Sequence, residues 1–307
     1  MSQHAKKVSF VLGSYNRLPY LQLTIDSIRQ EAINLAHEIF VIDGGSDDGS
    51  LPWLVQQKDI ITIVQHNRGE WAGKNIERRS WGYFMNLGFK ASQGEYVCML
   101  SDDSLLIPGA VRNGIAHIER LRAAGTRVGA GAFYFRDWSR HDHYQVGHSL
   151  GGKLYVNHGL YVRQVLQEVG YADEGYFFYN GDGDLCLKMW QQGYEVVACP
   201  DSYVEHYPHA NVAVRSTNYD RFNADRERYF KKWDGIYYDL REHNLGFWEE
   251  KQYDDVTNTG ERFAQLHTGV VAANPNLNKP KGLMFRLAQR CQWKVASAKR
   301  KWQLLWR

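Results

Sequence analysis

Residues 94–109, GEYVCMLSDDSLLIPG, contain an apolar run that ends in two adjacent carboxylates. The run 96–100 has the residue types of a buried strand, and Asp102 and Asp103 follow it almost directly. Two like charges beside an apolar segment repel each other and lose hydration energy, unless a cation or another partner stands opposite them. The alternative is that both aspartates only form a turn before a helix that Pro108 opens.

Outward from this stretch, the first hundred residues alternate between strand-like and helix-like patterns. Apolar side chains recur at helical spacing at Leu21, Ile25, Ile28 and Ala32. Strands separated by helices predict βαβ units, and therefore an α/β fold with a mostly parallel central sheet flanked by helices. The predicted strands cover residues 8–12, 38–42, 60–64, 96–100, 128–135 and 196–199, and the later predicted helices cover 162–169 and 184–192.

Polar residues gather where the predicted parallel strands end. In such sheets, ligands bind beyond the carboxyl ends of the strands. The residues at these ends are Ser14-Tyr15-Asn16-Arg17, Asp43, Asn67-Arg68 and Asp102-Asp103. The sequence therefore predicts a binding site along this edge of the sheet.

Composition narrows the class of protein. The chain has 307 residues, 44% of them hydrophobic, and a net charge of +3, which is too small to indicate nucleic-acid binding. Its four cysteines form no CxxC pair, so we expect reduced thiols in a cytoplasmic protein. The first residues lack the apolar run of a signal peptide, and no stretch approaches the ~20 apolar residues of a membrane span. No Walker loop is present and no GxGxxG follows the first strand, which disfavours P-loop and dinucleotide-binding proteins.

The C-terminal segment 274–307 has a different character. Beyond the linker-like residues 274–280, apolar residues recur at helical spacing and basic residues fall largely off that stripe. A cationic amphipathic helix of this kind suits an anionic membrane surface. A helix packed on the domain with a solvated basic face would show the same pattern, and both interpretations stay open.

A second acidic cluster lies far downstream, in GDGDLCLKMWQQGYEVVACPDSYVEH, residues 181–206. Asp184 suits the role of a helix cap, whereas Asp182 has no evident structural duty. His206 ends the passage. A lone histidine is more often structural than a ligand, but the carboxylates elsewhere in the chain offer it metal-binding partners.

Four segments in this order resemble glycosyltransferase family 2, whose members are inverting enzymes of the GT-A fold. They are VSFVLGSYNR, EIFVIDGGSDDGS, GEYVCMLSDDSLLIPG and the passage that ends in His206. The resemblance runs through roughly residues 7–210. It implies a GT-A, Rossmann-like domain at 1–215, with a nucleotide-binding half at 1–105 and an acceptor half at 106–215. A helical extension at 216–273 and the basic helix at 274–307 would follow.

The resemblance also implies roles for particular residues. Ser14, Asn16, Arg17 and Asp43 would hold the nucleotide base, with Asn86 and Asp102 as further donor-binding residues. A carboxylate at Asp43 could accept the imino proton of uracil, which favours a UDP-sugar and leaves dTDP-sugars open.

The family's Asp-any-Asp metal motif corresponds to Ser101-Asp102-Asp103, so its first Asp is Ser here. Asp103 would bind Mg²⁺ or Mn²⁺, with substrate phosphates completing the coordination shell. His206 would be a second ligand and would favour Mn²⁺ somewhat.

Asp182 corresponds to the family's catalytic base, which takes the proton of an acceptor hydroxyl. Gly181 stands where the family often has Glu, and we expect it to open room for the acceptor. The segment 69–83 is longer than usual. Its Arg78 or Arg79 could meet the diphosphate or the acceptor, although a solvated helix face is the slightly favoured interpretation.

The resemblance implies a transferase that moves a sugar from a nucleotide-sugar donor to a saccharide or lipid-linked saccharide acceptor. The Gln-any-any-Arg-Trp motif of processive synthases is absent, which predicts the addition of one or a few sugars. Polysaccharide assembly for the cell envelope, at the inner face of the membrane, would suit the basic C-terminal helix. The alternatives are a degenerate nucleotide-sugar or glycan-binding domain without catalysis, and a sugar-phosphate nucleotidyltransferase. Retention of both Asp103 and Asp182 counts against the degenerate domain, and the 13–16 loop does not fit the nucleotidyltransferase.

Overall fold

The computed structural model describes residues 7–208, 210, 217–238 and 246–273. It divides into a first unit that runs to Phe263 and a second that begins at Ala264. Of the second unit, the helix α9 (Ala264–Ala273) is described, and the predicted amphipathic helix at 274–307 lies outside the described residues. No helix in the described ranges has the length and apolarity that crossing a bilayer would need.

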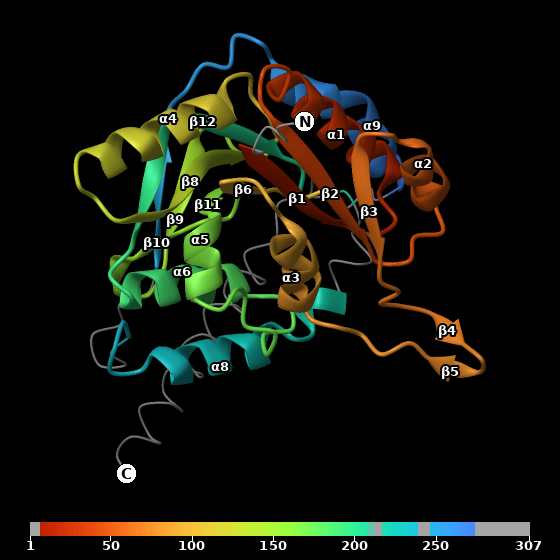
Figure 1. The fold of residues 1–307 in the computed structure, drawn as a ribbon. Coiled ribbons are helices and arrows are strands. Elements are labelled where there is room, and N and C mark those ends of the chain that lie inside the picture. The colour runs from red at the N-terminus through yellow and green to blue at the C-terminus, as the bar shows by residue number, and fades with distance from the viewer. Residues whose placement is uncertain (1–6, 209, 211–216, 239–245, 274–307) are drawn as a thin grey trace, which may run out of the picture. The chain divides into compact units, whose positions relative to one another are not determined.

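The core of the first unit is a single mixed sheet (Figure 1). Its main path runs β10-β9-β8-β11-β6-β1-β2-β3, with β12 joined to β7 and β8, and β13 joined to β9. Strands β3, β2, β1 and β6 pair in parallel, as the alternating pattern predicted. Beyond β6 the pairing is antiparallel except between β12 and β8, so the sheet contains both kinds of pairing. The strands are β1 (Val8–Ser14), β2 (His37–Asp43), β3 (Ile60–Val64), β6 (Tyr96–Met99), β7 (Ser104–Leu106), β8 (Val128–Asp137), β9 (Tyr144–His148), β10 (Leu154–Tyr155), β11 (Gly159–Val162), β12 (Glu195–His206) and β13 (Phe247–Lys251).

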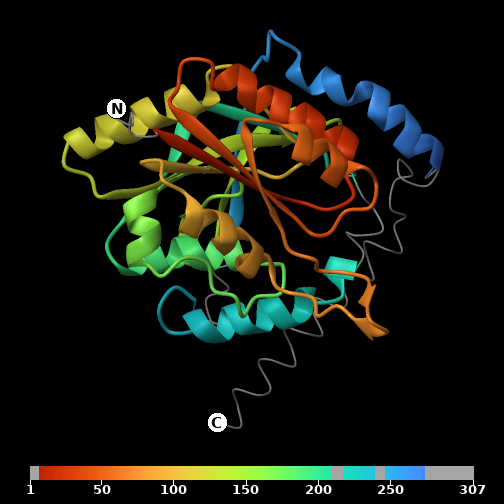
Figure 2. The same ribbon diagram turned by 45° about the vertical axis from the view of Figure 1, so that its right-hand side comes forward.

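Helices cover both faces of this sheet (Figures 1 and 2). Helices α1 and α4 lie over one face, and α3, α5 and α6 lie over the other. The predicted helical stripe of α1 is fully buried, which confirms its periodicity. Gly88 lets α3 approach β1 closely, because a Cβ there would come within 2.5 Å of the Val11 side chain. The helices are α1 (Leu18–Glu31), α2 (Ser50–Gln56), α3 (Trp81–Ala91), α4 (Ala110–Ala123), α5 (Arg163–Glu168), α6 (Gly181–Gln191) and α8 (Phe222–Trp233), with 3₁₀ turns at Leu150–Gly152 and Thr259–Phe263.

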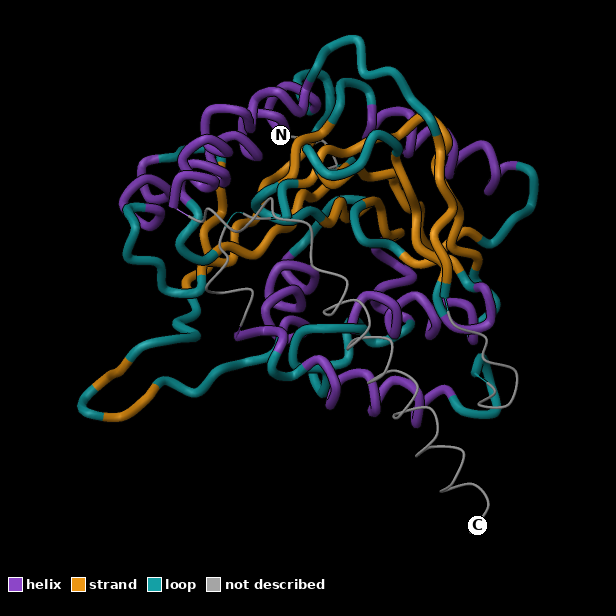
Figure 3. Tube along the Cα trace, turned by 180° about the vertical axis from the view of Figure 1, so that it is seen from behind, coloured by secondary structure: helices purple, strands orange, loops and turns teal. Residues whose placement is uncertain are grey.

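The segment 69–79 forms an arm rather than the helix face that we expected. Strands β4 (Glu70–Trp71) and β5 (Lys74–Asn75) make a hairpin apart from the main sheet. Its turn residues Ala72 and Gly73 both have positive φ, as a tight two-residue hairpin turn requires. The hairpin projects away from the sheet and helices (Figure 3).

The segment 216–273 also differs from the predicted helical extension. It contains α8, but β13 adds a strand to the sheet by pairing antiparallel with β9. Asp184 anchors α8, because its buried carboxylate accepts hydrogen bonds from Trp233 Nε1 at 2.9 Å and from Lys232 Nζ at 2.9 Å. Asp184 is therefore no helix cap; the residue before α6 is Asn180, which makes no capping side-chain hydrogen bond.

Candidate functional site

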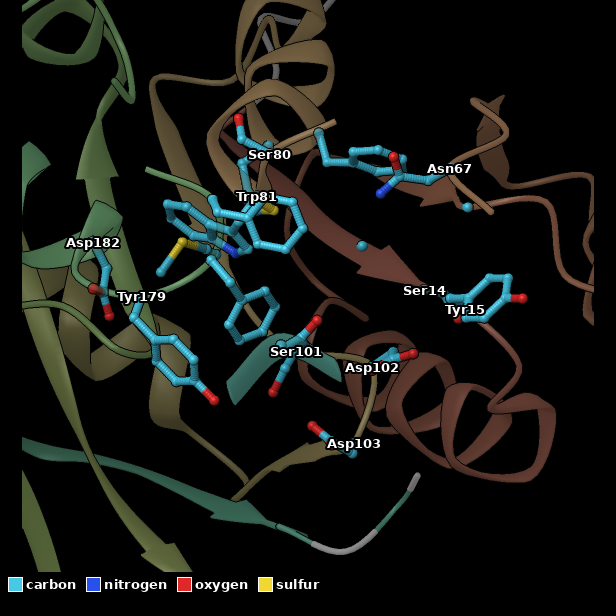
Figure 4. A pocket seen from close by; sticks show the side chains of 18 of the residues that line it. Ser14, Tyr15, Asn67, Ser80, Trp81, Ser101, Asp102, Asp103, Tyr179 and Asp182 are labelled. Atoms are coloured by element: carbon cyan, nitrogen blue, oxygen red, sulfur yellow. The ribbon is translucent and has the colours of Figure 1, made fainter. Parts of the chain in front are cut away.

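A cavity of about 480 Å³ opens beyond the carboxyl ends of the parallel strands, where the sequence predicted a site. Of the predicted site residues, six line it: Ser14, Arg17, Asp102, Asp103, Asp182 and His206. Asp182 reaches it from the start of α6, and Asp102 and Asp103 reach it from the turn between β6 and β7 (Figure 4). Carboxylates far apart in the chain thus share one cavity.

Arg17 is the partner that the adjacent carboxylates needed. Its Nη1 donates to Asp102 at 2.7 Å and to Asp103 at 2.8 Å, and both aspartates are buried. Burial raises the pKa of Asp102 to about 6, against the attraction of Arg17. For Asp103 burial acts in the same direction, but the charges of Arg17 and His206 outweigh it and hold the pKa below its ordinary value. Arg17 therefore faces the acidic pair, although the resemblance assigned it to the nucleotide base.

His206 stands between two carboxylates. Its Nδ1 lies 2.7 Å from Asp137 Oδ1, so Nδ1 carries a proton when Asp137 is charged, and its Nε2 lies 3.5 Å from Asp103 Oδ1. The hydrogen bond from His206 holds the pKa of Asp137 below its ordinary value, although burial opposes this. The contact with Asp137 fixes the ring and leaves Nε2 directed at Asp103, which is how proteins commonly orient a histidine that binds a metal.

A divalent cation would fit here. Asp103 Oδ1 is buried and accepts no hydrogen bond from the described residues. It converges with an oriented imidazole nitrogen, and hard oxygen plus imidazole suits Mn²⁺ or Mg²⁺. Within the described residues no three acidic, histidine or cysteine side chains form a ready cluster, so most of the coordination shell would come from substrate phosphates and water. Ser101, which stands at the first position of the motif, shares its hydroxyl with Ser104 and His158 instead.

Asp182 lies in the first turn of α6 and is largely surrounded by uncharged groups. Its carboxylate accepts a hydrogen bond from its neighbour Gly183 N–H at 2.8 Å and a long one from Asn157 Nδ2 at 3.4 Å. Burial raises the pKa of Asp182 to about 6. A carboxylate with this pKa is ionised at neutral pH and remains basic enough to accept a proton.

Gly181 does not open room for an acceptor. The indole of Trp81 fills that place, because a Cβ on Gly181 would lie 2.9 Å from Trp81 Cε3. Trp81 itself lines the cavity beside the candidate base (Figure 4). The absence of a side chain at Gly181 therefore lets the Trp81 indole form part of the cavity wall.

Three predicted donor-binding residues do not line the cavity. Asp43 is fully buried, and both its oxygens accept hydrogen bonds from the turn that follows, from Gly45 N–H, Ser46 N–H and Ser46 Oγ. Asn16 exchanges hydrogen bonds with Asp47. The Asn86 amide joins α3 to the 172–174 loop through Ala172 and Glu174, which is a structural role. Their predicted contacts with the donor remain predictions.

Other residues line the cavity to which the sequence assigned no individual role. Tyr15 lies under the guanidinium of Arg68, with 5.2 Å between the Arg68 Cζ and the ring centroid. Both residues follow predicted strands, and this position at the binding edge of the sheet is the sequence feature that indicates them. Asn157 and Tyr179 also line the cavity, and nothing in the local sequence marks them.

Comparisons with known proteins show the family and the fold. The family profile described as "Glycosyl transferase family 2" matches residues 9–182, more than half of the chain. This chain belongs to glycosyl transferase family 2, a family of enzymes.

Particular relatives are distant. Protein CgeD of Bacillus subtilis (strain 168) is 27% identical over 103 residues, which cover 34% of this chain and 24% of CgeD. The uncharacterized glycosyltransferase YwdF of the same organism is 24% identical over 219 residues, 67% of this chain and 73% of YwdF. The chain therefore spans about a quarter of the first relative and nearly three quarters of the second.

Solved structures share the fold. Residues 1–349 of S. aureus TarS match with a TM-score of 0.53 at 14% identity, covering 94% of this chain and 77% of that one. A mannosyltransferase from Pyrobaculum calidifontis, solved with GDP-Man and Mn²⁺, matches with a TM-score of 0.53 at 16% identity, covering 98% and 84%. The GT-A fold that the motifs implied is thereby confirmed.

Proposed function

We propose that this protein transfers one or a few sugars, with inversion, from a nucleotide-diphosphate sugar to a hydroxyl of a saccharide or lipid-linked saccharide. A UDP-sugar is the leading donor. The observation that carries the proposal is that Asp182 and Asp103 line one cavity in a family 2 fold. In this proposal Asp182 accepts a proton, and Asp103 acts on the diphosphate through a bound cation.

Asp182 is the proposed base. The acceptor oxygen attacks the anomeric carbon, the bond from that carbon to the diphosphate oxygen breaks, and the hydroxyl proton passes to Asp182. A single displacement inverts the anomeric configuration. The raised pKa supports this role, because a base near pKa 6 accepts a proton more readily than an ordinary aspartate.

The donor would lie along the ends of β1 and β6. Ser14 and Tyr15 supply a hydroxyl and an aromatic face there, and Arg68 caps the face of Tyr15. Asp103 and His206 would hold a divalent cation between them and the diphosphate. When bound, such a cation stabilises the negative charge that develops on the departing nucleoside diphosphate.

The acceptor and the cellular site remain proposals of the same kind. A cytoplasmic enzyme held at the inner face of the membrane by residues 274–307 would suit cell-envelope polysaccharide assembly on a lipid carrier. Flotation with anionic liposomes, with and without residues 280–307, tests this part separately.

The deciding experiment is product formation across a panel of nucleotide sugars, with and without Mn²⁺. We expect turnover of one donor class, and we expect Asp182→Asn to lower transfer by about 10²–10⁴-fold while UDP binding stays within about twofold. Asp201→Asn, at an exposed carboxylate outside the cavity, is the matched control. UDP binding without any turnover would favour the non-catalytic binding domain, and normal transfer by Asp182→Asn would remove the base assignment.

A further inference from the structure

Three arginine side chains lie close together at one side of the cavity, and we call them the rim arginines: Arg68 and Arg78, which line the cavity, and Arg221, which lies over the lining residue Phe177. Arg68 follows β3, Arg78 lies in the loop before α3, and Arg221 precedes α8. Arg68 and Arg78 both donate to Thr217 Oγ1, at 3.2 and 3.4 Å. Arg78 and Arg221 both lie over the ring of Phe177, with guanidinium carbons 4.6 and 5.3 Å from its centroid. Neutral groups thus hold three cations together.

The rim arginines have no carboxylate partner in the described part of the chain. Among the described residues, no acidic side chain forms an ion pair within 4.0 Å with any of the three, and Arg78 donates instead to the Asn218 side-chain oxygen. Burial lowers the pKa of Arg78 to about 10, repulsion from the other two adds to this, and Asp220 opposes it only weakly. Arg17 and Arg29 show the usual alternative, since each forms ion pairs at 2.7 Å. Three adjacent cations without a counter-ion are stabilised when an anion binds.

The chemistry of the rim arginines favours a phosphoryl group. Guanidinium groups present planar, paired N–H donors that match phosphate oxygens, and they remain charged at all physiological pH values. Stacking on Phe177 and the bonds to Thr217 and Asn218 fix their direction before a ligand arrives. This preorganisation reduces the entropy lost on binding.

The cluster spans two sides of the cavity, because Arg68 lies over Tyr15 on the donor side and Arg78 and Arg221 lie over Phe177. Phe177 lies five residues before Asp182, and Arg221 leads into α8, which Asp184 anchors to the same helix as Asp182. The diphosphate of the donor belongs with Asp103, His206 and Arg17 on the proposed function. Arg78 and Arg221 therefore lie near the elements that carry the base.

We propose that the rim arginines bind a phosphoryl group of the acceptor, so that the acceptor is a phosphate-bearing saccharide, polyol or lipid-linked sugar. This inference rests on the proposed function, because it requires an acceptor that approaches Asp182. The same chemistry could instead serve the diphosphate of the donor, and the experiment distinguishes these two sources.

The test is titration of inorganic phosphate into the full-length protein saturated with Mg²⁺ and UDP, followed by calorimetry. We expect phosphate to bind the UDP-loaded protein, and we expect Arg78→Gln/Arg221→Gln to weaken that binding by about tenfold or more. The affinity for UDP should stay within about twofold. Arg127→Gln is the control, because Arg127 also stacks on an aromatic ring, Tyr194 at 4.3 Å, but lies outside the cavity. Arg78→Lys/Arg221→Lys keeps the charge and should fall between the two if the double glutamine variant folds poorly.

Three results would overturn the inference. Phosphate that competes with UDP would assign the rim arginines to the donor. Phosphate that binds the double variant as well as the parent, or does not bind the UDP-loaded parent, would leave the cluster without this role. Failure of the parent to bind UDP would instead count against the proposed function, so the two failures are distinguishable.

Discussion

Replacing Asp182 by Asn should stabilise the protein at neutral pH while it removes transfer. The folded-state pKa of Asp182 is about 6, and the ordinary aspartate value is 3.8. The unfolded carboxylate therefore loses its proton first as pH rises, and the folded state loses stability between pH 4 and pH 6. The shift corresponds to about 3 kcal/mol, and contact with water through the cavity lowers the expected effect to about 1–2 kcal/mol. Asparagine carries no charge, so the variant does not bear the free-energy penalty of burying an ionised carboxylate.

Urea unfolding at pH 4 and at pH 8 measures the effect. We expect the variant and the parent to have similar free energies of unfolding at pH 4, and the variant to be more stable at pH 8. The control Asp201→Asn should show no difference that grows over this range. A variant whose advantage does not increase between pH 4 and pH 6 would refute the idea that burial strains the ionised carboxylate.

Three further outcomes are expected. The pH profile of kcat should rise through a single ionisation near pH 6 and then level off, because the deprotonated form of Asp182 is the base; a profile flat from pH 4.5 to 8 would exclude that role. Asp103→Ala should abolish the Mn²⁺-dependent part of UDP binding measured by calorimetry, and an unchanged Mn²⁺ effect would place the cation elsewhere. Asp184→Asn should destabilise the protein by about 3 kcal/mol in urea unfolding, because it leaves Lys232 without its buried carboxylate; a loss below about 1 kcal/mol would contradict the anchoring of α8.

The strands and helices of the N-terminal half could be predicted because their signals are local. The buried stripe of α1 and the apolar run of β6 are both readable within a few residues. The edge of the sheet where the cavity opens followed from the strand order, since parallel strands end together. Strand order thus predicts Asp103 at this edge, whereas Asp182 is assigned to the same site only by the resemblance to the family.

The partners of individual side chains were not predictable in the same way. Arg17 meets the acidic pair across 85 residues, and Asp184 meets Trp233 across 49. Each side chain has a plausible local role, and only tertiary packing selects another one. The prediction of a helix face at 69–79 was wrong for a related reason. Charged residues at near-helical spacing also suit a hairpin and its flanking loops.

The side chain of Asn67 closes the base of the hairpin arm. Its amide donates to the Arg79 carbonyl at 3.3 Å and accepts from the Arg79 N–H. These two bonds form a clasp that joins the two ends of the segment 68–78. Just beyond this clasp Arg68 and Arg78 still line the cavity, whereas no residue of the hairpin 70–75 does. The tip of the hairpin is therefore the part of the arm that can be lengthened, shortened or exchanged while the cavity lining stays the same.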